Sequence, residues 1–420
     1  MANISNKKPN NISNEKTTWQ HLMSVPIWVA ALGYFVDIYD LILFSVVRVQ
    51  SLESIGITGD KLATQGLIPL NTQMLGMLVG GIIWGILGDK KGRLSVLFGS
   101  ILLYSLANIA NGFATDLTQY AVLRFIAGIG LAGELGAGIT LVAEILPKQI
   151  RGYGTTLVGT VGMLGAVLAY LISTIFDWRT CYFIGGGLGL MLLVLRVGVF
   201  ESGMFHQTKQ QQVQRGNFLM LFMPQKRFLK YLYCILIGFP TWFVIGILIT
   251  LSPEFSQYLG FSEKAISGKA VMFAYLGLSI GDLATGVLSQ WLQSRKKVVL
   301  YCILMAILMT IVFLVAPIKT LTFFYFNCFL LGVSMGYWAL FVTISAEQFG
   351  TNLRATVATT VPNVARGTLV LITILFQFAK ENMGLTWAAL SVGMLTMSIA
   401  LIALYFMEET FTKDLNYNEE

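Results

Sequence analysis

Apolar runs of roughly 20 residues recur along the sequence from residue 26 to residue 407, with short polar segments between them. A helix of about 20 apolar residues crosses the roughly 30 Å hydrocarbon core of a bilayer. Only 12% of the residues are charged and 55% are hydrophobic, whereas charged residues make up about a quarter of a soluble domain. The sequence therefore predicts an all-α membrane protein, with the lipid bilayer as its surroundings.

Twelve such runs predict twelve transmembrane helices, so both termini lie on one side of the membrane. The first 25 residues are too polar for a signal peptide, and we expect a disordered tail there. No segment outside the spans is long enough for a soluble domain. The predicted spans are 26–47, 66–88, 95–114, 119–145, 152–176, 179–200, 229–256, 269–292, 297–316, 321–347, 355–379 and 385–407.

Lysine and arginine are distributed unevenly between the two sides of the membrane. If the N-terminus is cytoplasmic, 18 of the 28 basic residues lie on the cytoplasmic side, 7 lie outside and 3 lie within spans. Because short cytoplasmic loops are enriched in Lys and Arg, this bias predicts both termini inside the cell membrane, the inner membrane in a bacterium. The bias also accounts for the net charge of +7, so no nucleic-acid partner is expected.

The four cysteines fall within apolar spans without paired spacing, and we interpret them as packing residues. The two histidines lie outside the spans and far apart in the sequence. No disulfide framework, metal site, cofactor or catalytic cluster is therefore expected, and the chain is not predicted to be an enzyme.

The chain repeats itself at a fixed offset of 203 residues. This offset separates Glu144 from Glu347, Arg151 from Arg354, and Gly133 from Gly336. A shared offset for an acid, a base and a glycine predicts two homologous halves, each a bundle of six helices. The predicted organisation is a cytoplasmic tail 1–25, a first bundle 26–205, a cytoplasmic linker 206–228, a second bundle 229–407 and a cytoplasmic tail 408–420.

The link between the second and third spans, residues 85–93, reads GILGDKKGR. It resembles the cytoplasmic signature GxLxDxxGR of the major facilitator superfamily. Residues 286–295 (GVLSQWLQSR) form a degenerate second copy, with Gln290 in the place of Asp89. The resemblance implies two pseudo-symmetric six-helix bundles that transport by alternating access.

Further fragments extend this resemblance over nearly the whole chain. Residues 33–40 (GYFVDIYD) resemble a first-span segment of metabolite:proton symporters, and residues 124–134 (RFIAGIGLAGE) resemble their fourth span. Residues 200–205 (FESGMF) and Glu409-Thr410 are similar to the sequences that end each half, although Gly203 replaces the usual proline. These fragments are specific for the superfamily and much less so for its substrate.

Three mid-span acids are candidates for proton coupling: Asp37, Asp40 and Glu134. A charge inside a span costs about 2.5–3.5 kcal/mol on insertion scales, so each needs a partner, a wet cavity or a function. Asp37 and Asp40 share a helix face, where each carboxylate affects the ionisation of the other. The alternative is that one of them caps a neighbouring helix or pairs with Arg124. Glu134 lies about 15 Å along the helix from Arg124 and must find its partner on another span.

The candidate substrate-binding residues combine a guanidinium with polar and aromatic groups. Arg366 follows Pro362 and Asn363 in the eleventh span, and an Arg fork in a wet cavity matches a carboxylate or a phosphate. The alternative is an ion pair between Arg366 and Glu347 or another acid, with the aromatic residues serving only as packing. The full candidate set is Arg366, Asn363, Arg124, Tyr337, Trp338 and Trp242.

A third set of charges is assigned to gating because the resemblance places it at the cytoplasmic rim, where such residues form ion pairs that hold one access state closed. A solvated surface is the alternative. The set is Asp89, Arg93, Glu144, Arg151, Glu201, Glu347 and Arg354.

The predicted function is secondary active transport, with proton-coupled uptake of a small organic anion or zwitterion as the preferred form. Proton-driven efflux of a small molecule or drug is the alternative. Residues 159–165 (GTVGMLG) lack the proline that drug antiporters of this superfamily carry in the fifth span, which favours uptake. The expected partners are a small-molecule substrate and protons, and the protein is expected to act as a monomer.

Overall fold

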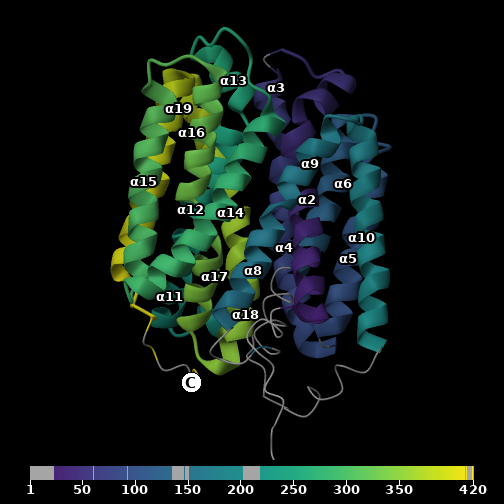
Figure 1. Cartoon of the computed structure of the whole chain (residues 1–420), viewed down its shortest axis with the longest axis vertical. Helices are drawn as coiled ribbons and strands as arrows, with labels where there is room; N and C mark the ends of the chain where they lie inside the picture. The colour runs from purple at the N-terminus through teal and green to yellow at the C-terminus, as the bar shows by residue number, and fades with distance from the viewer. Residues whose placement is uncertain are drawn as a thin grey trace, which may run out of the picture.

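The computed structural model describes residues 23–59, 61–91, 93–134, 146, 151–201, 218–411, 413 and 419. Over this part of the chain the regular structure is helical, and none of it forms a strand. The helices stand nearly upright in two groups placed side by side (Figure 1). The termini end of the bundle carries the start of α2 and the C-terminus, and the far end carries α3 and α13 (Figure 1).

The first group contains the helices up to residue 201. Its elements are α2 (Val25–Ser54), α3 (Lys61–Thr64), η1 (Gln65–Leu67), α4 (Ile68–Lys91), α5 (Arg93–Asn111), α6 (Leu117–Leu131), α8 (Arg151–Met163), α9 (Gly165–Ser173) and α10 (Trp178–Glu201).

The second group begins after the predicted linker, of which only residues 218–228 are described. Its elements are η3 (Phe218–Phe222), α11 (Gln225–Leu236), α12 (Phe239–Phe243), η4 (Val244–Ile249), α13 (Ser252–Tyr258), α14 (Ser267–Trp291), α15 (Arg295–Val315), α16 (Leu321–Ser334), α17 (Trp338–Glu347), α18 (Thr351–Gly367) and α19 (Leu369–Phe406).

The helix lengths agree with the predicted spans. Among the described residues, nine helical stretches are long and apolar enough to cross a membrane, and Val96–Asn111 and Leu117–Leu131 are shorter apolar helices. One of the nine, Asn352–Phe406, has 55 residues and turns at Gly384, whose φ is 78°. This stretch covers the two last predicted spans, so the described helices are consistent with twelve crossings.

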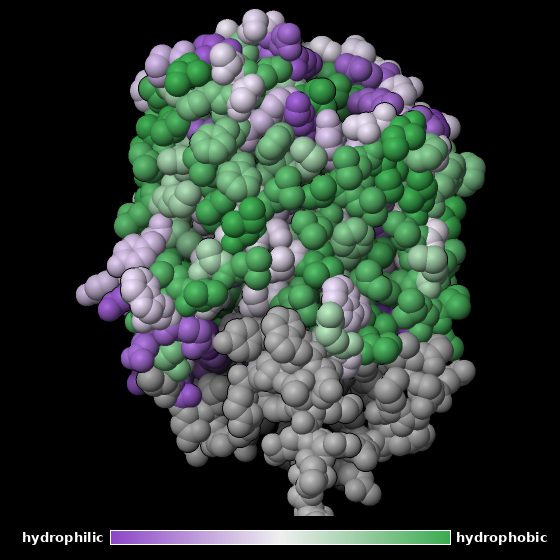
Figure 2. All heavy atoms as spheres, viewed as in Figure 1, coloured by the Kyte–Doolittle hydropathy of each residue, from purple (hydrophilic) through white to green (hydrophobic). Residues whose placement is uncertain are grey.

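Below a more polar upper end, the surface of the bundle carries a broad apolar belt, with a second polar patch at the lower left (Figure 2). Large apolar side chains on this surface point outward, among them Val194, Val287, Leu371 and Phe378 with 61–72% exposure. A soluble protein would have to cover such a surface. In a bilayer, lipid hydrocarbon chains cover this surface, so its apolar side chains are not exposed to water. The surface therefore agrees with an all-α membrane protein.

The repeat predicted from the sequence is visible in the packing of matching helix pairs. In the first half, α4 crosses α6 where a Cβ on Gly76 would overlap the main chain of Phe125. In the second half, α14 crosses α16 where a Cβ on Gly277 would overlap the main chain of Phe329. Both crossings bring backbones into contact, which only glycine allows. The two halves therefore share one packing scheme.

Each half also interrupts a helix at the same place in the repeat. In the first half, α6 ends at Leu131 and is followed by a turn at Ala132 and Gly133. In the second half, α16 ends at Ser334 and α17 begins only at Trp338. A break within a span frees backbone groups that must bond to other side chains. Interrupted helices near mid-membrane are typical of transporter sites.

Candidate functional site

A cavity lies where the two halves face each other, and we call it the midplane cavity. One wall comes from α2 and α8, and the others come from α12, η4, α14, α17 and α18. Its free volume is about 10 Å³, room for about one water molecule, so its walls lie nearly in contact in this structure. Its lining residues are Tyr34, Ile38, Leu41, Met163, Thr241, Trp242, Ile245, Tyr275, Leu278, Trp338 and Arg366.

Three of the predicted substrate-binding residues meet in this cavity: Trp242, Trp338 and Arg366. The two indole rings pack edge to face, with their centroids 5.9 Å apart. The Arg366 guanidinium lies over the Trp338 ring at 5.6 Å. The combination of a cation with flat aromatic walls suits a small planar molecule that carries a negative charge.

The two tryptophans that line the cavity each lie next to an irregularity in the helical backbone. Trp338 is the first residue of α17, directly after the break in the tenth span. Trp242 lies in α12, directly before the π-helical segment η4. A π-helical segment shifts the register of the side chains on either side and is frequent at functional sites. Neither irregularity is encoded in the hydropathy of the sequence.

Arg366 has no acidic partner among the described residues. Its side chain is 1% exposed. One terminal nitrogen donates to the Asn363 Oδ1 at 3.2 Å, and its Nε has no hydrogen-bond partner within the described chain. The predicted alternative, an ion pair with Glu347, is wrong, because Glu347 pairs with Arg295 at 2.7 Å. A buried guanidinium in this condition is ready to receive an anion.

The other three predicted substrate-binding residues do not line the midplane cavity. Tyr337 turns its hydroxyl away and donates to the Ile237 carbonyl at 2.8 Å. Asn363 lies behind Arg366, with its amide on the Ala132 carbonyl at 2.9 Å. Arg124 stays within the first half.

Arg124 is fully buried and bonds to three elements of its own half. It donates to the Asn108 Oδ1 at 3.1 Å and to the main-chain carbonyl of Asp40 at 3.0 Å. Its guanidinium also lies 5.5 Å from the centre of the Tyr182 ring. Arg124 therefore ties α6 to α2 and α5, close to the predicted proton-coupling acids.

Asp37 and Asp40 are both completely buried on α2. Neither carboxylate forms an ion pair with a residue in the described ranges. Arg366, Glu134 and Arg196 all act electrostatically on Asp37. Asp37 is thus within electrostatic range of the cation of the midplane cavity and of the charged pair of the first half.

Glu134 finds its partner on another span, as the sequence predicts. That partner is Arg196 of α10, which meets both carboxylate oxygens of Glu134. The two side chains are 1% and 3% exposed. A Cβ on Gly33 would overlap this pair, so the glycine in α2 makes room for it. The sequence analysis did not single out Arg196, although it is a basic residue inside the sixth apolar run and could have been found on that ground.

Most of the predicted gating residues have side chains outside the described part of the chain: Asp89, Arg93, Glu144, Arg151 and Glu201. In the second half, Glu347 of α17 pairs with Arg295, which begins α15. Arg354 donates to the Phe349 carbonyl at 3.4 Å. Within that half, an ion pair therefore links two helices at the termini end.

The sequence did not predict the polar contact between the halves at the far end. There, one nitrogen of Arg48 on α2 donates to both carboxylate oxygens of Glu254 on α13, at 2.5 and 2.6 Å. Ser267 on α14 donates to the Ser45 carbonyl at 2.7 Å. Sequence reasoning counted Arg48 as a loop residue, but it is fully buried. These contacts close the far end of the interface.

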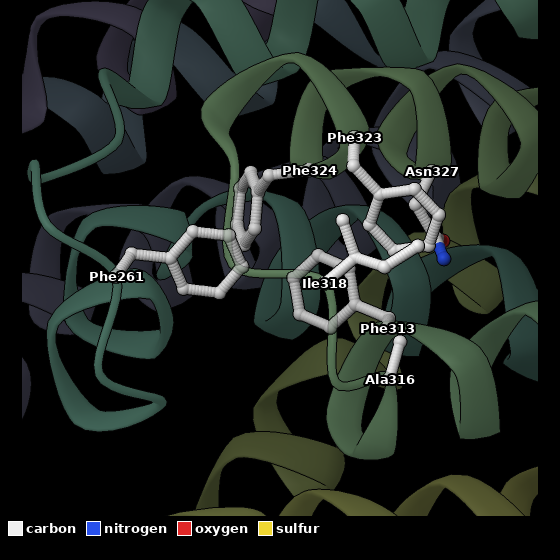
Figure 3. Close-up of a pocket in the computed structure, with 7 residues that line it drawn as sticks. All are labelled: Phe261, Phe313, Ala316, Ile318, Phe323, Phe324 and Asn327. Atoms are coloured by element: carbon white, nitrogen blue, oxygen red, sulfur yellow. The ribbon is translucent and has the colours of Figure 1, made fainter.

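A second cavity lies at the far end between α15 and α16 (Figure 3). Phenylalanine rings dominate it, with Phe313 and Phe324 4.9 Å apart and Phe261 and Phe324 5.3 Å apart. Asn327 is its one polar lining residue, and none of the lining residues is charged. An ionic substrate would find no counter-charge there, so the midplane cavity is the candidate site.

A family model described as the Major Facilitator Superfamily matches residues 30–367. The chain belongs to the major facilitator superfamily. Members of this superfamily are membrane transporters, so the chain is an integral membrane transporter and not an enzyme. The twelve-helix, two-bundle architecture follows with the family.

Named relatives span nearly the whole chain. The niacin transporter NiaP of Acinetobacter baylyi is 25% identical, over 93% of this chain and 94% of its own. The cis,cis-muconate transport protein of the same organism is 25% identical, over 95% and 97%. The proton:xylose symporter XylE, solved with 6-bromo-6-deoxy-D-glucose, matches with a TM-score of 0.70 at 16% identity, over 95% and 98%. The likeness to XylE shows the fold alone.

Proposed function

We propose that this transporter imports a small organic anion or zwitterion together with protons, as a monomer in the inner membrane with both termini cytoplasmic. The observation that carries the proposal is Arg366, a buried guanidinium without an acid partner in the described chain, facing the midplane cavity. Removing a charge from water costs several kcal/mol. A substrate anion that binds there would offset that cost.

The shape and polarity of the cavity narrow the substrate class. Its aromatic walls, Tyr34, Trp242, Tyr275 and Trp338, surround one cation. Trp242 Nε1 has no hydrogen-bond partner in the described residues and is free to donate to a substrate oxygen. Niacin and cis,cis-muconate, named in the relatives, are flat carboxylates. A planar carboxylate therefore suits this chain better than a neutral sugar.

The coupling residues we propose lie in the first half. Asp37 is buried without an ion pair in the described chain, and Arg366 acts on it electrostatically. A substrate carboxylate on Arg366 would weaken the pull of that cation on Asp37. Asp37 would then bind a proton more readily when the anion is present. Asp40 and Glu134 are the alternative proton carriers.

The test is uptake into proteoliposomes under an imposed pH gradient. Labelled nicotinate and cis,cis-muconate serve as anionic probes and xylose as the neutral comparison. We expect at least one anion to accumulate when the lumen is alkaline, with loss of accumulation in the presence of a protonophore. Accumulation only when the gradient is reversed would indicate efflux. Accumulation driven by a sodium gradient would show that sodium, and not the proton, is the coupling ion. Uptake of xylose but neither anion would contradict the proposal.

A further inference from the structure

The side-chain amide of Asn363 makes three hydrogen bonds at the centre of the bundle. Its nitrogen donates to the Ala132 carbonyl of α6 at 2.9 Å and to the Thr359 carbonyl of its own helix at 3.0 Å. Its oxygen accepts from Arg366 at 3.2 Å. One buried amide thus touches both the cation of the midplane cavity and the opposite half of the protein.

The bond to Ala132 is made at the interruption of the fourth span. α6 ends at Leu131 and Ala132 is its C-cap residue, so the amide of Asn363 reaches the turn that follows this helix. At the matching interruption in the second half, Thr285 of the same half donates to the Gly336 carbonyl at 2.6 Å. One described contact at these interruptions thus stays within its half, and the other crosses the interface.

The contact at Asn363 also depends on a close approach of α4. A Cβ on Gly81 would come within 2.9 Å of the Asn363 Cβ, closer than real side chains pack. Nearby on the same pair of helices, a Cβ on Gly367 would come within 2.6 Å of Leu78. These contacts place Asn363 in the tightest part of the interface between α4 and α18.

We propose that Asn363 is a positioning residue that couples the anion site to the contact between the halves. Its oxygen orients the Arg366 guanidinium, and its nitrogen holds α18 against the broken end of α6. When the halves separate at this level, the bond to Ala132 is lost and the amide is free to rotate. Arg366 then loses its fixed orientation, so anion affinity falls in that access state.

This inference rests on the proposed function, because it takes Arg366 as the anion anchor. A carrier must bind its substrate with different affinity in its two states for binding to shift the equilibrium between them. Asn363 supplies such a difference without contacting the substrate. The part of the inference that concerns the interface can be tested without any substrate.

The test follows the reactivity of a cysteine placed at the interface. Thr156 of α8 lies across from Gly286 of α14, with its Oγ1 3.5 Å from where a Cβ on that glycine would lie. Thr156→Cys in purified protein reacts with a polar maleimide when the halves separate there. We expect Asn363→Ala to raise that rate about fivefold, as for the loss of one buried hydrogen bond. Asn363→Asp keeps the acceptor for Arg366 but loses the donor, and should raise it similarly.

Three further variants separate this role from a general loss of packing. Gly81→Ala displaces Asn363 from the other half and should also raise the rate. Asn327→Ala removes a comparably buried asparagine of the second half, 2% exposed against 1%, and should leave the rate unchanged. Arg366→Gln should raise the rate alone but add nothing in the Asn363→Ala background, because Arg366 acts on the interface through that amide.

An unchanged rate in Asn363→Ala, or an equal rise in Asn327→Ala, would overturn the inference. Additive effects of Arg366→Gln and Asn363→Ala would show that the anion site and the interface are not linked through this residue, and would also overturn it. Proteoliposome uptake is scored separately. If neither anion is imported but the cysteine results hold, the proposed function fails while the interface role of Asn363 stands.

Discussion

Arg196 and Arg366 are both guanidinium groups buried inside spans, one in each half of the bundle. Arg196 meets both oxygens of Glu134, and the pair is closed off from solvent. Among the described side chains, Arg366 has only the neutral Asn363 as a hydrogen-bond partner, and it lies over an aromatic ring beside a cavity. Since the helix framework is repeated, the difference lies in the side chains: the buried guanidinium of the first half is paired with an acid, and we propose that the one of the second half pairs with the substrate anion.

The largest effect that tests this comparison is on stability. Arg196→Met leaves Glu134 buried and unpaired, and breaking a buried pair costs about 3–5 kcal/mol. Arg366→Met removes a charge that no described acid compensates, so stability should stay unchanged or rise. Thermal unfolding in detergent measures both. A large loss for Arg366→Met would mean that this cation is part of a structural pair after all.

The closed far end gives the next effect. Glu254→Gln removes the charged acceptor of the buried Arg48, and a hydrogen bond to a charged group contributes about 1.5–3 kcal/mol. The far end should therefore open more often, by roughly tenfold or more. The reporter is Thr373→Cys, because Thr373 of α19 donates to Asn71 of α4 across the interface at 3.1 Å. Equal maleimide labelling with and without Glu254→Gln would show that this ion pair does not hold the halves together.

The smallest effect concerns the end of the second half, where Glu409 caps α15. Burial raises the pKa of Glu409, but hydrogen bonds from Ser294 Oγ and the amides of Arg295, Lys296 and Phe411 outweigh this and lower its pKa. A lowered pKa means that the cap stabilises the protein above the ordinary Glu pKa and is lost as the pH falls through the lowered value.

Glu409→Gln should therefore destabilise the protein by about 0.5 kcal/mol at neutral pH, the low end for a cap because the group is exposed to solvent. The difference from the parent protein should shrink in acid. Unfolding measured at pH 7 and pH 4 gives this comparison. A difference that grows as the pH falls would exclude the capping role.

The sequence predicted the spans well because the length of an apolar run is a local property. It predicted that Glu134 needs a partner on another span, but not which one, because residues 62 positions apart meet only through packing. The breaks after Leu131 and Ser334 were missed, since the groups that satisfy them, such as Asn363 and Thr285, come from distant helices. Trp242, Trp338 and Arg366, which the sequence grouped because aromatic and charged residues stand out within apolar runs, line one cavity in the structure; that they bind substrate stays a prediction.

Arg124 and Asn363 illustrate the limit of that reasoning. Both are polar and lie mid-span, and both were predicted to bind substrate. The structure instead gives each of them protein partners: Asn108 and the Asp40 carbonyl for Arg124, and the Ala132 carbonyl for Asn363. A polar residue inside a span can be recognised in the sequence, because placing a polar group in the membrane costs free energy. Which residue it contacts depends on the three-dimensional packing of the helices.

The most direct test of the division between the halves compares four variants in proteoliposomes. Asp37→Asn, Asp40→Asn and Glu134→Gln each mimic the protonated form of an acid, and Arg366→Lys keeps the charge but loses the planar fork. Nicotinate binding, counterflow and uptake driven by a pH gradient are measured for each. We expect one amide variant to lose gradient-driven uptake while it keeps counterflow, and Arg366→Lys to lose about 1–3 kcal/mol of binding without any gradient. Full proton-driven uptake in all three amide variants, with normal binding in Arg366→Lys, would contradict the account and make these buried charges structural.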